Sequence, residues 1–249
     1  MAARRCIAVA AHKGGSGKTT LAVNLAGALG ASGCSVAVVD GDPQGAATIG
    51  LGIVPGSLSL YEVLIGAVDV RAAIMATAAP GVSVLPATLD LAGAEVELPR
   101  RPGWQTVLAE RLRPLGELFD VTIVDTPPGL GVLSYMALSA ADQVLVACPP
   151  DFLAVRSLPM VLQSVERAGV ELIGIVPTMV ERRTRHEADF SAYLEQSYGD
   201  RLLGAIPRRV ILRDALAAGL PITSYSPRSD AAEAFHRLAK GVLNAKTTT

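Results

Sequence analysis

A glycine-rich segment near the N-terminus constrains the fold of this chain more than any other stretch. It is the run His-Lys-Gly-Gly-Ser-Gly-Lys-Thr-Thr at residues 12–20, with apolar residues before it at 6–11 and after it at 21–29. This pattern predicts a buried strand, a loop and a helix. Glycines let the backbone approach a ligand closely, and the N–H groups of such a loop and of the helix N-terminus attract anions. The segment therefore predicts a phosphate-binding loop.

The spacing within this loop departs from the common phosphate-loop pattern, which has a glycine five residues before the Gly-Lys-Ser/Thr end. That position holds His12 here, and Lys13 follows it. This arrangement resembles the deviant Walker A box of the ParA/MinD group of ATPases. In such a loop Lys18 adds a mobile positive charge and Thr19 adds a hydroxyl placed for Mg²⁺. The plainer alternative is a glycine-rich turn that carries two surface lysines.

Strand-like apolar runs alternate with helical patterns along the rest of the chain. Half of the 249 residues are hydrophobic, so a large core is easily built. Such alternation predicts an α/β fold with a doubly wound, mostly parallel sheet and helices on both faces. We expect a single domain over residues 1–249, with a disordered tail at 245–249. The predicted strands are 6–11, 35–39, 82–85, 121–124, 143–147, 171–176 and 202–206. The predicted helices are 18–31, 59–66, 104–118, 130–140, 153–168, 187–198, 209–218 and 229–244.

Two further motifs stand at the ends of predicted strands. Asp40 and Asp42 follow one apolar run and precede Pro-Gln-Gly, and Asp125 follows another and precedes Thr-Pro-Pro-Gly. Asp40 and Asp42 point to the same side of their strand, and two like charges that close need a cation to offset their repulsion. Asp125 would hold Mg²⁺ through its water shell, because Mg²⁺ keeps several waters. These motifs resemble the Walker A′ and Walker B boxes of the ParA family. The alternative for the first is a polar strand end with a turn.

The resemblance implies a Mg²⁺-dependent ATPase. It assigns catalysis to Lys13, Lys18 and Asp42, of which Asp42 positions or activates the attacking water. It assigns the metal to Thr19, Asp40 and Asp125. In the resembled family two ATP-bound copies face each other, and the residue matching Lys13 reaches the partner's phosphates. The resemblance therefore implies an ATP-dependent homodimer, whereas a solvated loop lysine is the alternative for Lys13.

The implied nucleotide contacts fall into two groups. The first surrounds the phosphates and comprises Lys13, Gly14, Gly15, Ser16, Gly17, Lys18, Thr19 and Thr20. The second follows from the run Ile-Pro-Arg at 206–208, which matches a family segment that helps to enclose adenine. With the run at 177–179 it gives Thr178, Met179, Pro207 and Arg208. The resemblance covers residues from about 4 to 244.

The formal net charge of the chain is -1, so no bulk electrostatic field draws it to nucleic acid or to a membrane. Residues 180–240 are locally basic, with ten basic and eight acidic side chains. Members of the resembled family bind DNA non-specifically as ATP dimers, through phosphate contacts rather than base contacts. A solvated face of mixed charge is the alternative for each arginine in this region. The candidate DNA-binding residues are Arg182, Arg183, Arg185, Arg209, Arg213 and Arg237.

Chromosome or plasmid segregation is the leading function, with non-specific DNA and a ParB-like activator protein as partners. Positioning of a protein cargo and a MinD-like membrane-associated ATPase are alternatives, and so is a small-molecule kinase or amidoligase with its own acceptor pocket.

No apolar stretch is suited to span a bilayer and no signal peptide precedes the loop, so we expect no membrane partner. Cys6, Cys34 and Cys148 lack metal or redox spacing. These features favour the cytoplasm, and the resemblance implies association with the nucleoid there.

Overall fold

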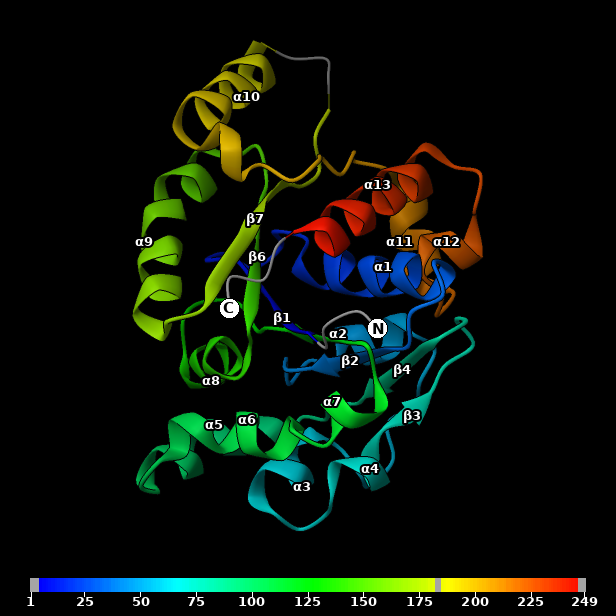
Figure 1. Cartoon of the computed structure of the whole chain (residues 1–249), viewed down its shortest axis with the longest axis vertical. Helices are drawn as coiled ribbons and strands as arrows, with labels where there is room; N and C mark the ends of the chain where they lie inside the picture. Colours follow the sequence, from blue (N-terminus) through cyan, green and yellow to red (C-terminus); the bar gives the residue numbers. More distant parts are fainter. Residues whose placement is uncertain (1–4, 182–184, 246–249) are drawn as a thin grey trace.

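The computed structural model describes residues 5–181 and 185–245 of the chain. Its centre is a seven-stranded sheet with the order β3-β4-β2-β5-β1-β6-β7. Figure 1 shows β3 and β4 at one end of this sheet and β6 and β7 at the other. All neighbouring strands are parallel except β3, which runs antiparallel to β4 at one edge. The strands are β1 (Arg5–Ala10), β2 (Val36–Asp40), β3 (Met75–Ala76), β4 (Val82–Leu85), β5 (Val121–Asp125), β6 (Gln143–Cys148) and β7 (Glu171–Pro177).

Helices cover both faces of the sheet. One face is covered by α1 (Lys18–Ala31), α2 (Ala46–Gly50), α11 (Val210–Ala217), α12 (Ile222–Tyr225) and α13 (Asp230–Asn244). The other face is covered by α3 (Leu60–Ile65), α5 (Leu91–Glu97), α6 (Val107–Leu112), α8 (Val132–Ala140), α9 (Phe152–Ala168) and α10 (Arg185–Tyr198). The remaining helices are α4 (Val70–Ala73) and α7 (Leu115–Leu118), with short 3-10 turns η1 (Leu98–Arg100), η2 (Trp104–Thr106) and η3 (Gly199–Arg201). This arrangement confirms the predicted fold class.

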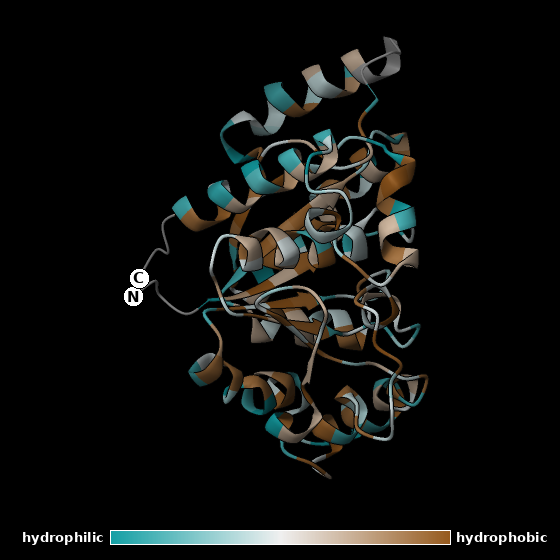
Figure 2. Cartoon of the chain, turned by 90° about the vertical axis from the view of Figure 1, so that its right-hand side faces the viewer, coloured by the Kyte–Doolittle hydropathy of each residue, from teal (hydrophilic) through white to brown (hydrophobic). Residues whose placement is uncertain are grey.

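Alternate residues of each strand serve the two faces. In β2, Val36 and Val38 pack with α1 and α13, whereas Ala37 and Val39 pack with the helices of the opposite face. All five residues of β2 are buried. The strands therefore read as continuous apolar runs rather than as alternating ones, as expected for a sheet covered on both sides. Figure 2 shows this as hydrophobic colour along the strands.

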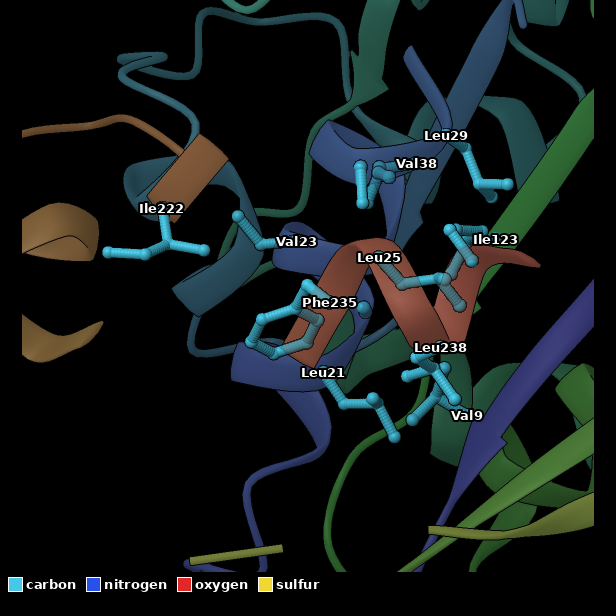
Figure 3. Packing of buried hydrophobic residues seen from close by; sticks show 14 of the residues in the cluster. Val9, Leu21, Val23, Leu25, Leu29, Val38, Ile123, Ile222, Phe235 and Leu238 are labelled. Atoms are coloured by element: carbon cyan, nitrogen blue, oxygen red, sulfur yellow. The ribbon is translucent and has the colours of Figure 1, made fainter. Parts of the chain in front are cut away.

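Helix α1 is packed between the sheet and α13. Leu21 and Leu25 meet Phe235 and Leu238 of α13, with Val9 of β1 beside them (Figure 3). The helix is apolar on all sides because it is buried on all sides, with residues 21–29 all inaccessible to solvent. Burying α1 in this way fixes the position of its N-terminus, and so of the loop that precedes it.

One predicted strand is wrong. Residues 202–206 form one isolated bridge, from Leu202 to Ile175, and the next bridge joins Val180 to Pro207, beyond the predicted range. Gly204 between them adopts a φ of +57°, which interrupts the extended conformation, although Ile206 still donates its N–H to the Pro177 carbonyl at 2.8 Å. The two-residue strand β3 was not predicted. The end of the predicted disordered tail, residues 246–249, lies outside the described residues.

No helix in the described ranges has both the length and the apolar character needed to cross a bilayer.

Candidate functional site

The glycine-rich segment forms a tight loop between β1 and α1. Gly15 and Gly17 adopt φ values of +73° and +84°, a region that favours glycine. The Ser16 hydroxyl donates to the Lys13 carbonyl at 2.8 Å and so closes the loop on itself. Gly17 is the N-cap of α1, and no side chain caps the helix. The first N–H groups of α1 therefore have no partner within the helix and face the loop as donors for an anion.

The three carboxylates of the second and third motifs meet at the same edge of the sheet. Asp40 ends β2, Asp125 ends β5, and the two stand opposite each other in the register of these neighbouring strands. Gly41 follows Asp40 and lies close to the end of β5, where it donates its N–H to the Asp125 carbonyl at 2.9 Å. A Cβ atom on Gly41 would lie 2.6 Å from that carbonyl oxygen, so this close approach requires glycine. Asp42 follows at the margin of the cleft.

Asp40 is buried and its carboxylate is already hydrogen-bonded. It accepts from the N–H and the hydroxyl of Thr48, both at 2.7 Å, and from the N–H of Asp42 at 3.2 Å. Burial raises the pKa of Asp40, while these hydrogen bonds act to lower it. Asp40 therefore holds α2 and the backbone of Asp42 in place, which suits a supporting position behind a metal rather than direct ligation. Sequence reasoning missed Thr48, since no motif spacing links it to Asp40.

Asp125 is fully buried in a different way. Within the described part of the chain, neither of its carboxylate oxygens has a hydrogen-bond partner of good geometry. Burial raises the pKa of Asp125 to about 8, Asp40 adds to this, and the nearby Thr19 hydroxyl and Lys18 ammonium lower it. A buried carboxylate without partners is costly unless a cation neutralises it. The Asp125 oxygens, beside the Thr19 hydroxyl, are therefore suited to a hard divalent cation such as Mg²⁺.

The protein alone does not form a complete metal cage in the described residues, because no cluster of three or more His, Cys, Asp or Glu side chains is arranged to hold an ion. This fits Mg²⁺ in particular, which commonly binds one or two carboxylates together with substrate phosphates and waters. Lys18 lies next to the same point and is itself buried. Burial lowers the pKa of Lys18, while Asp125 and Asp42 act to raise it.

A cleft of about 530 Å³ runs from the glycine-rich loop toward the start of α11 and α13. Its loop end is lined by Gly14 to Leu21, with Asp42 beside them. Its far end is lined by Ile206 to Arg209, Val210, Leu212, Arg213 and Phe235. Apart from Lys13, the residues predicted for the base and those predicted for the phosphates thus line one cleft, although they are far apart in the sequence.

The end of β7 clamps the loop from the side of the cleft. Thr178 is buried and donates its hydroxyl to the Ser16 carbonyl at 2.8 Å. Met179 follows with a φ of +56°, a left-handed conformation that is unusual for a residue other than glycine. The Met179 side chain lies against Gly17, where an added Cβ would be 3.3 Å from its Cε. The two residues predicted near the base therefore also hold the phosphate loop in shape.

Lys13 is absent from the described residues that line this cleft. It lines an adjoining hollow of about 190 Å³ with Pro149, Pro150 and Asp151. The hollow and the cleft share five lining residues, Gly14, Gly15, Ser16, Met179 and Arg208. Its ammonium is 2.8 Å from the Asp151 carboxylate. Sequence reasoning missed Asp151, since nothing in the local pattern relates positions 138 residues apart.

Comparison with known proteins gives the family. A family model described as an AAA domain matches residues 4–172. The chain is 36% identical over 252 residues to the chromosome partitioning protein ParA of Caulobacter vibrioides, which covers 96% of this chain and 94% of that protein. It is 39% identical over 246 residues to the chromosome-partitioning ATPase Soj of Thermus thermophilus, with 96% and 95% covered. This chain belongs to the ParA/Soj family of partitioning ATPases.

A solved structure similar to this ParA/Soj family member contains a nucleotide and a metal. It is cobyrinic acid a,c-diamide synthase from Mycobacterium smegmatis with a bound ATP analogue and magnesium, which is 34% identical with a TM-score of 0.84. The match covers 98% of each chain. The likeness thus extends over the whole sheet and includes the glycine-rich loop.

The arginines predicted to bind DNA are only partly accounted for in this ParA/Soj family member. Arg182 and Arg183 lie outside the described residues, and so does the side chain of Arg185. Arg209 pairs with Asp230 at 2.6 Å, and Arg237 pairs with Glu233. Arg209 and Arg237 line a common hollow of about 610 Å³, whereas Arg213 lines the cleft described above. The three described arginines therefore lie in or beside the cleft, and two of them, Arg209 and Arg237, are already paired.

Proposed function

We propose that this chain is an ATP-driven molecular switch that dimerises on ATP, binds DNA non-specifically as the dimer and hydrolyses ATP to drive chromosome or plasmid segregation. The observation that carries the proposal is the buried carboxylate of Asp125 beside Thr19 and Lys18 at the glycine-rich loop, which has no hydrogen bond of good geometry within the described residues. A divalent cation bound there would neutralise the carboxylate, and phosphates on the loop would supply the cation's further ligands. Membership of the ParA/Soj family supports the same function.

The proposed mechanism divides the work among the residues at the sheet edge. The loop N–H groups and Lys18 bind the β- and γ-phosphates and neutralise their charge. Thr19 and Asp125 would hold Mg²⁺, with Asp40 in a supporting position, and the ion would supply positive charge to offset the charge that develops on the phosphates. Asp42 orients a water for attack on the γ-phosphate and accepts its proton. Thr178, Met179, Pro207 and Arg208 enclose the base.

The remaining parts of the proposal concern partners. Lys13 pairs with Asp151, is exposed and is absent from the described lining of its own cleft, which supports a role at the phosphates of a second copy. Arg182, Arg183, Arg185, Arg209, Arg213 and Arg237 supply the DNA contacts. A ParB-like protein stimulates hydrolysis, and the active dimer is associated with the nucleoid in the cytoplasm.

Sedimentation and DNA retention test the proposal when measured with ADP, with ATP and with ATP plus Asp42→Ala. We expect a monomer with ADP and a dimer with ATP that retains DNA. Asp42→Ala should lower the rate of hydrolysis by about 10²- to 10⁴-fold and trap the DNA-bound dimer. Dimerisation and DNA retention that are the same with ADP and with ATP would contradict the proposal.

Two controls sharpen this experiment. Lys13→Ala should abolish hydrolysis, whereas Lys240→Ala, which removes an exposed lysine of α13, should leave it unchanged. DNA retention should fall at least about tenfold between about 50 and 200 mM salt if even two phosphate contacts are made. ATP turnover without any added small-molecule acceptor separates this function from that of a synthetase, and liposome binding with ATP would favour a membrane-associated relative instead.

A further inference from the structure

The ion pair between Lys13 and Asp151 joins the phosphate loop to the start of α9. The Lys13 Nζ lies 2.8 Å from Oδ2 of Asp151, and the two side chains are 46% and 36% exposed. Lys13 holds the pKa of Asp151 below its ordinary value, so the carboxylate stays charged at neutral pH. Both partners are therefore charged at neutral pH, and the pair lies where another protein surface can reach it.

Asp151 is held in place independently of Lys13. Its second oxygen, Oδ1, caps α9 by accepting from the N–H groups of Leu153 at 2.8 Å and Ala154 at 3.2 Å. Pro149 and Pro150 precede it and restrict the backbone on the other side. The carboxylate is therefore a fixed anchor, and the flexible partner in the pair is Lys13.

We propose that Asp151 is a positioning residue that keeps Lys13 within its own subunit, and that each copy must release Lys13 from Asp151 before the lysine can reach the phosphates of a second copy. This inference rests on the proposed function, in which Lys13 acts across a dimer. In the single chain Lys13 is absent from the described lining of its own cleft, so the pair leaves the cleft open to nucleotide while the lysine is withheld.

The strength of the pair suits a release step. Exposed ion pairs are weak, and removing one changes an equilibrium by about 1.5- to 5-fold. Both copies release their lysine when a symmetric dimer forms, so the cost enters the dimerisation constant twice. We therefore expect the loss of Asp151 to tighten ATP-dependent dimerisation by the square of that factor, about 2- to 25-fold. The bound triphosphate of the facing copy repays the release, because it offers Lys13 more negative charge than one carboxylate does.

Asp151→Ser is the variant that isolates this contact. Serine is a good N-cap, so α9 keeps its cap and the fold is preserved, but its side chain is too short to pair with Lys13. Asp69→Ser is the matched control. Asp69 also caps a helix, by accepting from the N–H of Arg71 at 2.8 Å, and also lies near a cation, with Arg71 at 3.6 Å. It lies away from the glycine-rich loop, on α4.

Two measurements test the proposal. The first is amine labelling of Lys13 relative to the exposed Lys240 in nucleotide-free protein, which is readily resolved because the chain has only four lysines. The second is the protein concentration at half-maximal dimerisation with a slowly hydrolysed ATP analogue. We expect Asp151→Ser to raise the labelling of Lys13 and to lower that concentration, while Asp69→Ser changes neither.

Unchanged labelling and dimerisation in Asp151→Ser would overturn the inference, and so would weaker dimerisation, which would mean that Asp151 assists the dimer instead. Failure of the proposed function looks different. A wild-type chain that never dimerises with ATP would contradict the dimer itself, whereas the labelling of Lys13 would still decide whether Asp151 holds it.

Discussion

Asp125 is the residue whose surroundings make the strongest demand on a ligand. Its neighbour across the strand pair, Asp40, has both Thr48 donors and an N–H from Asp42, whereas Asp125 has no such donor of good geometry in the described ranges. Two carboxylates at equivalent strand ends thus differ in their surroundings. The Asp40 carboxylate is satisfied by protein donors, and we propose that the Asp125 carboxylate binds a cation.

We predict that Asp125→Asn makes the metal- and nucleotide-free protein more stable at pH 8. The folded pKa of about 8 lies above the ordinary value of 3.8, so the folded state binds this proton more tightly than the unfolded state. Stability is therefore lost as the pH rises from about 4 to about 8, and asparagine removes that loss. Thermal unfolding in EDTA should show a higher midpoint for the variant, by about 2–4 °C for each kcal/mol gained. The gap should shrink toward pH 5.

The contrast for this prediction is Asp120→Asn. Asp120 accepts from the N–H of Ser35 at 2.8 Å and from the Ser35 hydroxyl at 2.7 Å. These hydrogen bonds stabilise the charged carboxylate, so the substitution should lower the midpoint of thermal unfolding. A lower midpoint for Asp125→Asn as well would contradict our reading of Asp125. Asp125→Asn should also lose the Mg²⁺-dependent stabilisation by ATP that we expect of the wild-type chain.

At the scale of residues, the sequence predicts the position of a site residue where that residue belongs to a local motif. Asp40, Asp42 and Asp125 each follow an apolar run, so their common location could be predicted from strand ends alone. Asp151 and Thr48 could not, because their contacts with Lys13 and Asp40 depend on how separate loops fold together. The roles of all these residues remain predictions until the variants are measured.

At the scale of elements, α1 is held by close backbone contacts as well as by apolar side chains. Gly27 faces Pro221, and a Cβ atom there would lie 2.4 Å from the Pro221 Cβ and 2.8 Å from the Thr223 hydroxyl. The side chain of Asn24, one turn earlier, accepts from the N–H of Ile222 at 2.6 Å. The helix behind the phosphate loop is thus fixed to the segment that leads into α12.

We predict that Gly27→Ala destabilises the chain by about 1–3 kcal/mol, because the methyl group forces α1 and Pro221 apart. Denaturant unfolding measures this directly. Gly116→Ala is the matched control, since Gly116 lies in helix α7 and an added Cβ there meets nothing within 4 Å. That substitution should be stabilising by about 0.5–1 kcal/mol. Equal effects of the two changes would contradict the packing described for α1.

Long elements were predictable and short ones were not. The helix predicted at 18–31 matches α1, and the six predicted strands other than 202–206 match the observed strands to within a residue or two at each end. Helices α2, α4 and α12 and strand β3 have five residues or fewer, too few for a periodic pattern to be visible. They form because the neighbouring elements hold them, as Asp40 holds α2 through Thr48.

At the scale of the whole molecule, the site belongs to no single segment of the chain. Its three motifs stand at the ends of β1, β2 and β5, which are neighbours in the sheet in the order β2-β5-β1. The apolar runs predict strands, and the motifs predict that their ends converge, but neither specifies this order. Only the assembled sheet reveals it.

The insertion of β5 between β2 and β1 also governs when the site can exist during synthesis. The glycine-rich loop leaves the ribosome first, yet β1 has no neighbour in the sheet until residues 121–125 arrive on one side and 143–148 on the other. Pairings so distant in sequence form late. We predict that arrested nascent chains exposing residues 1–115 are not captured on immobilised ATP, whereas chains exposing the whole sheet are. Capture of the shorter chains would contradict this. A nascent chain of this kind is therefore unable to bind ATP at first, and it gains that ability only once all the strands that support the loop have been synthesised.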